Sequence, residues 1–431
     1  MNLKSNYRCW VIIYVAVTLS FATSAGRAAA QPGTIAPIIR RMEGSRDKHN
    51  WTEMISACRE AVAAGSTDEY LLRSLSWGLC RAGESDEGFD VASRNWRLNP
   101  CAWSLEQLVD AATDAGRFED ARKAARILAA NRAQWGTAAA ASQVAIDRVS
   151  SRTYHFVWMI DTANEALPFS NKSGIRIPVP WTKTRWQNAK WSISGAKSWQ
   201  EETIGESVCV RVVPDGKSPF GLEADVTLTP CTYKAEVQKA KEADYPDEVK
   251  HYLGKAPGID PDSQRAKSIV ESIKGKSRFE SIFNVMKWCR SNMQYKGIVG
   301  ESGGTSDEVL ARRNGHCEAM TTATVTLLRA CGIPARYIRG QTAIRGERGT
   351  GLWHTITEYY VTGLGWLPWD QLYPPFAIVP EFLCTFTYAY PYDLNHTTID
   401  GDLTMWDLWR FQSLGLNCEF CSYTLVRTSL D

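Results

Sequence analysis

Hydrophobic and polar residues follow the three-to-four-residue spacing of amphipathic helices along the first third of the chain. Three such stretches begin at Asn50, Gly83 and Gly116, each 33 positions after the last. Residues 70–81 and 102–115 between them carry the same pattern, and Asn99-Pro100 punctuates the series. The pattern therefore predicts a row of helix pairs over residues 45–149.

This spacing resembles that of tetratricopeptide repeats, which are helix pairs with a period of about 34 residues. Such repeats stack into a superhelix, so the resemblance implies a concave face that docks a protein or peptide partner. An unrelated array of helical hairpins fits the same pattern, and so does a purely structural helical cap.

The pattern changes at Thr153 to short segments of strand type. Five of them lie at residues 154–159, 174–179, 190–194, 207–213 and 224–228, with Pro, Gly and Asn between them. This succession is typical of an antiparallel β-sandwich, which we expect over residues 151–235.

Residues 307–370 combine a helix with paired strands. An apolar helical run opens at Cys317, a strand follows over residues 335–342, and a hairpin contains His354 and ends at Asp370. A cysteine at a helix start meets free N–H groups and the positive end of the helix dipole, which lower the pKa of its thiol. On paired strands Asp370 can face His354 and fix its tautomer.

Each of these three residues also has a structural explanation when taken alone. Cys317 fits a buried thiol at a helix end, His354 a core histidine, and Asp370 a turn residue. All three in this order and context favour a nucleophile, a base and an orienter.

The same segments resemble the core of the transglutaminase-like superfamily of bacterial proteins. The matching segments are 307–310, Gly315-His316-Cys317, 328–336, His354 and 365–370. The resemblance covers residues 281–373 and implies a papain-like α+β catalytic domain over residues 236–393. It also implies that Cys317 is the nucleophile, His354 the base and Asp370 the orienter.

The chain departs from that family pattern in two places. Thr355-Ile356 stands where the family often has Ala-Trp, and Gln371-Leu372 stands where it often has Pro-Thr. Exported members of the group commonly carry a β-domain before the core, as residues 151–235 would provide.

A Cys-His-Asp site predicts attack on a peptide or amide carbonyl and a thioester intermediate, with no cofactor and no metal. We expect the oxyanion to bind the Cys317 N–H and an upstream side chain, Gln294. Hydrolysis is favoured because water needs no second amine-binding site. The alternatives are a protein-cross-linking transglutaminase and a non-catalytic binding or scaffold protein.

Composition narrows the possible partners. The 431 residues are 44% hydrophobic and 22% charged, with a formal net charge of +2. These values are typical of a globular protein of two or three domains, and they argue against bulk-charge binding to nucleic acid or anionic membranes. Cys418 and Cys421 lack a second paired motif, so we expect a disulfide or buried thiols rather than zinc there.

The first 30 residues have the features of a signal peptide. Lys4 and Arg8 precede an apolar run over residues 10–22, and Ala28-Ala29-Ala30 forms a small-residue cleavage site. The apolar run is shorter than the roughly 20 residues of a spanning helix, although an uncleaved anchor is the alternative. We therefore expect a secreted or periplasmic protein, with no stable membrane insertion after cleavage.

Export would allow disulfides among the 12 cysteines. Removing Cys9 with the signal peptide and Cys317 as nucleophile leaves an even set of ten. Cys209 with Cys231, and Cys289 with Cys331, are the expected pairs because each lies within one predicted domain. Residues 394–431 form a C-terminal extension to which the pattern assigns no role.

Overall fold

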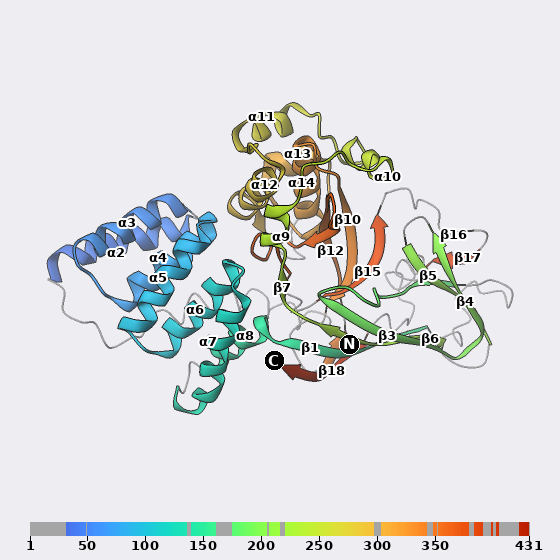
Figure 1. Cartoon of the computed structure of the whole chain (residues 1–431), viewed down its shortest axis with the longest axis horizontal. Coiled ribbons are helices and arrows are strands. Elements are labelled where there is room, and N and C mark those ends of the chain that lie inside the picture. Colours follow the sequence, from blue (N-terminus) through green and yellow to red (C-terminus); the bar gives the residue numbers. More distant parts are fainter. Residues whose placement is uncertain are drawn as a thin grey trace. The chain divides into compact units, whose positions relative to one another are not determined.

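The computed structural model describes residues 32–48, 50–135, 139–160, 175–204, 207–215, 220–296, 303–342, 348–350, 352–378, 383–390, 398–399, 402–404 and 422–430. The chain divides into two compact units (Figure 1): Met1–Val149 with Lys296–Gly300, and Ser150–Tyr295 with Glu301–Asp431. The predicted signal peptide and the Cys418-x-x-Cys421 pair lie outside the described residues. None of the helices in the described part is both long and apolar enough to cross a membrane.

The first unit is helical (Figure 1). Its elements are α2 (Pro32–Asp47), α3 (Trp51–Ala63), α4 (Glu69–Ala82), α5 (Ser85–Leu98), α6 (Ala102–Asp114), α7 (Phe118–Ala130), the short 3-10 turn η3 (Arg132–Gln134) and α8 (Ala139–Val149). Consecutive helices pack against each other. The predicted helical region is confirmed, whereas its identity as tetratricopeptide repeats stays a prediction.

Local sequence explains where these helices begin and end. The side chains of Asn50 and Asp68 accept backbone N–H bonds from the first turns of α3 and α4. Gly83 ends α4 with φ of 81°, a left-handed conformation that glycine adopts without steric cost.

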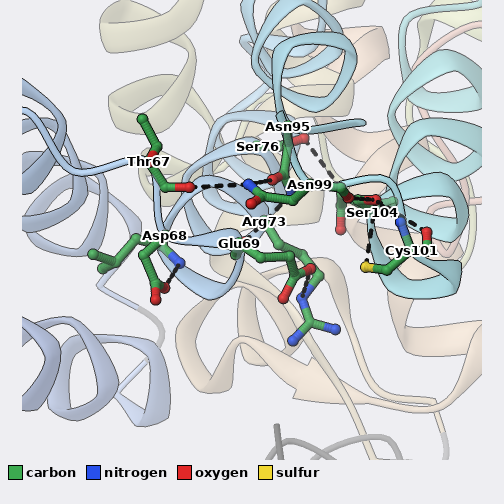
Figure 2. A network of polar contacts seen from close by, with 11 residues as sticks. Thr67, Asp68, Glu69, Arg73, Ser76, Asn95, Asn99, Cys101 and Ser104 are labelled. Atoms are coloured by element: carbon green, nitrogen blue, oxygen red, sulfur yellow. Dashed lines mark hydrogen bonds and ion pairs between the residues drawn. The ribbon is translucent and has the colours of Figure 1, made fainter. Parts of the chain in front are cut away.

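Polar side chains join α4, α5 and α6 (Figure 2). The Asn99 amide donates to the carbonyl of Thr67 and to Oδ1 of Asn95, both at 2.9 Å. The Ser104 hydroxyl at the start of α6 donates to the carbonyl of Asn99. These bonds satisfy backbone groups where one helix ends and the next begins, so Asn99-Pro100 marks a structured turn.

The second unit contains two five-stranded sheets (Figure 1). One has the order β11 (Arg348–Thr350), β18 (Ser422–Ser429), β1 (Ser151–Ile160), β6 (Phe220–Leu228) and β3 (Gln187–Ser194). The other has the order β16 (Thr398–Ile399), β17 (Asp402–Thr404), β2 (Ile175–Pro178), β5 (Ser207–Pro214) and β4 (Ala196–Ile204). The strands are antiparallel except for the β17–β2 pair. Their packing as a sandwich stays a prediction.

A four-stranded antiparallel sheet carries the candidate site. Its order is β13 (Gly365–Trp369), β12 (Leu352–Val361), β10 (Ala335–Thr342) and β15 (Leu383–Tyr390). Helix α14 (Cys317–Ala330) packs against β12 and β10. Its small and branched residues Ala319, Ala323 and Val325 are fully buried, which allows this close approach.

Further helices and short strands complete the unit. They are α9 (Lys234–Lys239), α10 (Asp247–Lys250), η5 (His251–Leu253), α11 (Gln264–Ile273), α12 (Arg278–Asn292) and α13 (Ser306–Arg312), with the strand pairs β8 (Gln294–Tyr295) with β9 (Asn314–Gly315), and β7 (Cys231–Thr232) with β14 (Ala377–Ile378). Helices α11, α12 and α13 pack on α14, so the helix that begins at Cys317 is surrounded by the core.

The predicted disulfides are wrong for the residues described. Cys209, Cys231, Cys289 and Cys331 are all buried, and no disulfide joins them in the described part of the chain. Cys209 lies on β5 and Cys231 on β7, which belong to different sheets. Cys289 instead accepts a hydrogen bond from the Thr324 hydroxyl at 3.5 Å, so its sulfur is a packed acceptor on α12.

Candidate active site

Gly315 and His316 set the start of α14. Gly315 has φ of 152°, within the range that favours glycine, and it pairs with β8 through the two-residue strand β9. His316 is the N-cap, and its Nδ1 accepts the backbone N–H of Glu318 at 3.3 Å. Cys317 therefore becomes the first residue of the helix, half-buried.

His354 and Asp370 meet across the hairpin. The register of β12 and β13 pairs Thr357 with Trp369, which makes Asp370 a diagonal neighbour of His354 on the same face. His354 Nε2 and Asp370 Oδ2 are 2.6 Å apart, and each side chain is 11% exposed. The other Asp370 oxygen accepts the Leu372 N–H at 2.9 Å, so the carboxylate is held on both sides.

Cys317 lies between this histidine and the strand that carries it. The His354 side chain and the backbone N–H of Thr355 both interact with its sulfur and lower the pKa of the Cys317 thiol. Because Nε2 of His354 is bound to Asp370, the Nδ1 side of the ring is left for the sulfur. Gly340 on β10 pairs with His354, so the residue directly opposite the histidine on that strand has no side chain.

The electrostatics favour an ion pair. Burial opposes ionisation of Cys317, but hydrogen bonds to His316 and His354 and the charge of His354 lower the pKa of its thiol to about 6. Burial alone would lower the pKa of His354, and the charge and hydrogen bond of Asp370 outweigh it and raise that pKa to about 10. Near neutral pH the pair is therefore a thiolate and an imidazolium.

His316 is a second imidazole beside the sulfur. Its Nδ1 is 4.0 Å from Cys317 Sγ, and the bond to Cys317 is the largest cause that raises the pKa of His316. Nδ1 cannot accept the Glu318 N–H and donate a proton to sulfur at the same time. The neutral ring caps α14, and the protonated ring contacts the thiolate.

The structure brings three of the four predicted site residues together: Cys317, His354 and Asp370. Gln294 is exposed on β8, and no hydrogen bond joins it to the other three among the described interactions. Sequence reasoning passed over its neighbour Tyr295, which is half-buried and close enough to Cys317 and Asp370 for their charges to act on it. Adjacent residues of a strand point to opposite faces. The predicted extended conformation of Gln294 and Tyr295 therefore indicates that only one of the two side chains can face Cys317.

Comparison with known proteins bears on the same segment. Residues 264–371 match the family model of the transglutaminase-like superfamily. An uncharacterized protein of Haemophilus influenzae is 27% identical over 155 residues, which cover 30% of this chain and 42% of that protein. The present chain thus spans less than half of that relative's length.

Two solved structures are similar over a larger part of the chain. A candidate cysteine protease from Cytophaga hutchinsonii has 12% identity and a TM-score of 0.38, covering 64% of this chain and 98% of that one. The periplasmic domain of TgpA from Pseudomonas aeruginosa has 15% identity and a TM-score of 0.29, covering 52% and 91%. The segment that holds Cys317, His354 and Asp370 matches the family model itself, and residues 264–371 are therefore a transglutaminase-like domain.

Proposed function

We propose that this protein is a thiol hydrolase that cleaves peptide or amide bonds through a Cys317 thioester. The observation that carries the proposal is the bond of 2.6 Å between the His354 ring and Asp370, on a histidine that also lowers the pKa of the Cys317 thiol. Nucleophile, base and orienter meet in the order that acyl transfer needs.

Acylation uses the ion pair directly. The Cys317 thiolate attacks the carbonyl carbon, a C–S bond forms, and the carbonyl π pair moves onto oxygen. When that pair returns, the C–N bond breaks and His354 gives its proton to the departing amine. Asp370 keeps the imidazole in the orientation that aims one nitrogen at the sulfur.

Deacylation reverses the proton transfer. Neutral His354 takes a proton from water as the water oxygen attacks the thioester carbon. The C–S bond then breaks, which releases the carboxylic acid and restores the thiolate and the imidazolium. A lysine amine in place of water would give an isopeptide bond, so the same residues also serve a transglutaminase. We favour water because it needs no second amine-binding site.

The test is to incubate the purified chain with a mixture of short glutamine-containing and amidated peptides, with and without the fluorescent amine dansylcadaverine. Hydrolysis predicts cleaved or deamidated peptides, identified by mass spectrometry, and no incorporated amine. Incorporation of the fluorescent amine into a peptide would show that the protein is a cross-linking transglutaminase instead of a hydrolase. A folded protein that turns over no peptide and whose Cys317 resists iodoacetamide would support the scaffold alternative.

Export and a protein partner on the helical unit are further parts of this proposal. Half-buried charged and aromatic side chains on α4, α6 and α8 support the partner: Arg73 lies 5.4 Å from the ring centroid of Trp103, and Arg148 binds Asp110 at 2.6 Å. Burial raises the pKa of Glu106 on the same face to about 8, which would favour a cationic group of the partner beside it. Cell fractionation of chains with and without residues 1–30 tests export.

A further inference from the structure

Tyr295 is held near Cys317 by a pair of two-residue strands, β8 and β9. Strand β8 runs parallel to β9, with Tyr295 opposite Gly315, two residues before Cys317. Gly315 has no side chain, so β9 leaves the space next to the phenol open. Tyr295 also packs against the core cluster that contains Ala319 and Met320 of α14.

The two residues of β8 differ in their surroundings. Gln294 is exposed and Tyr295 is half-buried, as expected when adjacent strand residues point to opposite faces. Burial, and then the negative charges of Cys317 and Asp370, raise the pKa of Tyr295. Its hydroxyl therefore stays protonated wherever the thiolate exists, and it can donate a hydrogen bond.

One backbone donor is also present at this point. The Glu318 N–H is bonded to His316, whereas the N–H of Cys317 belongs to a helix position that has no intrahelical acceptor. An acyl oxygen above Cys317 would meet this N–H on one side. A second donor is needed for the two-point binding that stabilises developing negative charge.

We infer that the Tyr295 hydroxyl is that second donor and binds the oxyanion formed when Cys317 attacks a carbonyl. This assignment rests on the proposed thiol chemistry and gives Tyr295 the role that the sequence suggested for Gln294. In the step concerned, the C–S bond forms as the carbonyl π pair moves onto oxygen. The oxygen keeps its negative charge and accepts hydrogen bonds from Tyr295 and the Cys317 N–H.

The experiment separates the thiolate from the oxyanion with two reagents. Iodoacetamide alkylates Cys317 without forming an oxyanion, and its rate reports only the thiolate. N-acetylglycinal adds reversibly to the thiolate and forms a tetrahedral oxygen, and its affinity follows from protection against iodoacetamide. Both are measured as functions of pH on the full chain, for wild type, Tyr295→Phe and Gln294→Ala.

The inference predicts that Tyr295→Phe weakens aldehyde binding at least tenfold and leaves alkylation within about twofold, because loss of one oxyanion donor costs roughly 10²–10³ in rate. Gln294→Ala should match wild type in both assays. Equal losses in the two assays, loss in Gln294→Ala alone, or unchanged aldehyde binding in Tyr295→Phe would each overturn it. So would a wild-type protein that is alkylated normally yet captures no aldehyde.

Failure of the proposed function is distinguishable from failure of this inference. Aldehyde capture that depends on Tyr295, without any peptide cleavage, would contradict the hydrolase function but support Tyr295 as an oxyanion donor. Peptide cleavage that Tyr295→Phe leaves unchanged would support the hydrolase function but contradict the role of Tyr295 as an oxyanion donor.

Discussion

The hydroxyl of Thr321 donates a hydrogen bond to the backbone carbonyl of Thr355 at 3.1 Å. The backbone N–H of the same Thr355 interacts with the Cys317 thiol and lowers its pKa. Residue 355 is therefore tied to α14 by both of its backbone polar groups, immediately after His354. These interactions connect the helix that begins at Cys317 to the strand that carries His354.

Thr321→Val tests that connection. The valine keeps the shape of the fully buried side chain and removes the donor, so we expect a loss of about 1–3 kcal/mol in the free energy of unfolding from the orphaned carbonyl. Peptide turnover should fall as well, because the sulfur and the imidazole lose their common anchor. Denaturant unfolding and turnover are measured on the same sample, with Thr322→Val as the matched control. Full activity in a destabilised Thr321→Val protein would contradict the positioning role.

Cys317→Ala should abolish turnover and covalent capture of an acyl probe. The change removes one half-buried sulfur at a helix start, so the free energy of unfolding should stay within about 1 kcal/mol of wild type. Cys101→Ala, which alters another half-buried thiol, serves as the control and should keep full activity. Activity that survives in Cys317→Ala would end the assignment of this protein as a thiol enzyme.

The ion pair predicts the pH dependence of alkylation. Cys317 should react with iodoacetamide from about pH 6 upward, well below the ordinary thiol pKa of 9.0. Asp370→Asn removes the charge that raises the pKa of His354, so the imidazolium is lost at lower pH and the thiolate loses stabilisation. The alkylation profile of Asp370→Asn should therefore shift to higher pH, whereas an unshifted profile would show that Asp370 does not support the ion pair.

Turnover should respond in a graded way to changes in the base and its orienter. His354→Ala should abolish it, because the leaving amine receives no proton. Asp370→Ala should leave slow but measurable turnover, since the imidazole remains and only its orientation is lost. Rates on a small amide, with folding checked by thermal melting, give the order. Equal losses in the two variants would mean that Asp370 does more than orient.

The buried pair of Arg336 and Glu358 should matter for stability rather than for chemistry. Arg336 Nε and Glu358 Oε2 are 2.7 Å apart, with side-chain exposures of 6% and 2%, and the guanidinium lies 4.0 Å from the ring centroid of Trp366. Glu358→Ala leaves that buried charge without its partner and should cost about 3–5 kcal/mol in the free energy of unfolding.

Lys267→Ala is the control for this measurement, because it breaks an exposed pair with Asp262. It should change the free energy of unfolding by no more than about 1 kcal/mol. If the two substitutions lower the free energy of unfolding by similar amounts, burial does not determine how much the Arg336 pair contributes to stability.

Local patterns were enough to place the elements around the candidate site. The apolar run after Cys317, the stop at Gly332 and the hairpin that ends at Asp370 each depend on residues close in sequence, and the structure has a helix and paired strands there. The bond between His354 and Asp370 follows from that hairpin. The catalytic roles of these residues stay proposals.

The features missed depend on contacts between distant residues. Strand β4 shows no apolar alternation, because polar side chains such as Gln200, Glu201 and Glu202 fill its middle. Tyr295 gains its place only through the pairing of β8 with β9. The expected disulfides rest on the cysteine count and the predicted export. Neither the count nor the compartment determines whether two cysteine sulfurs lie within bonding distance in the fold.

The pairing of β18 with β1 joins Ser429 to Ser151 and leaves β1 an edge strand on that side until β18 is in place. A nascent chain must therefore be synthesised at least as far as Ser429 before this sheet can close. Contacts of such long sequence separation make folding slow, because the loop-closure entropy is lost before the strands pair. During that interval the open edge of β1 is available to other chains, so a chaperone that covers this edge would favour correct folding.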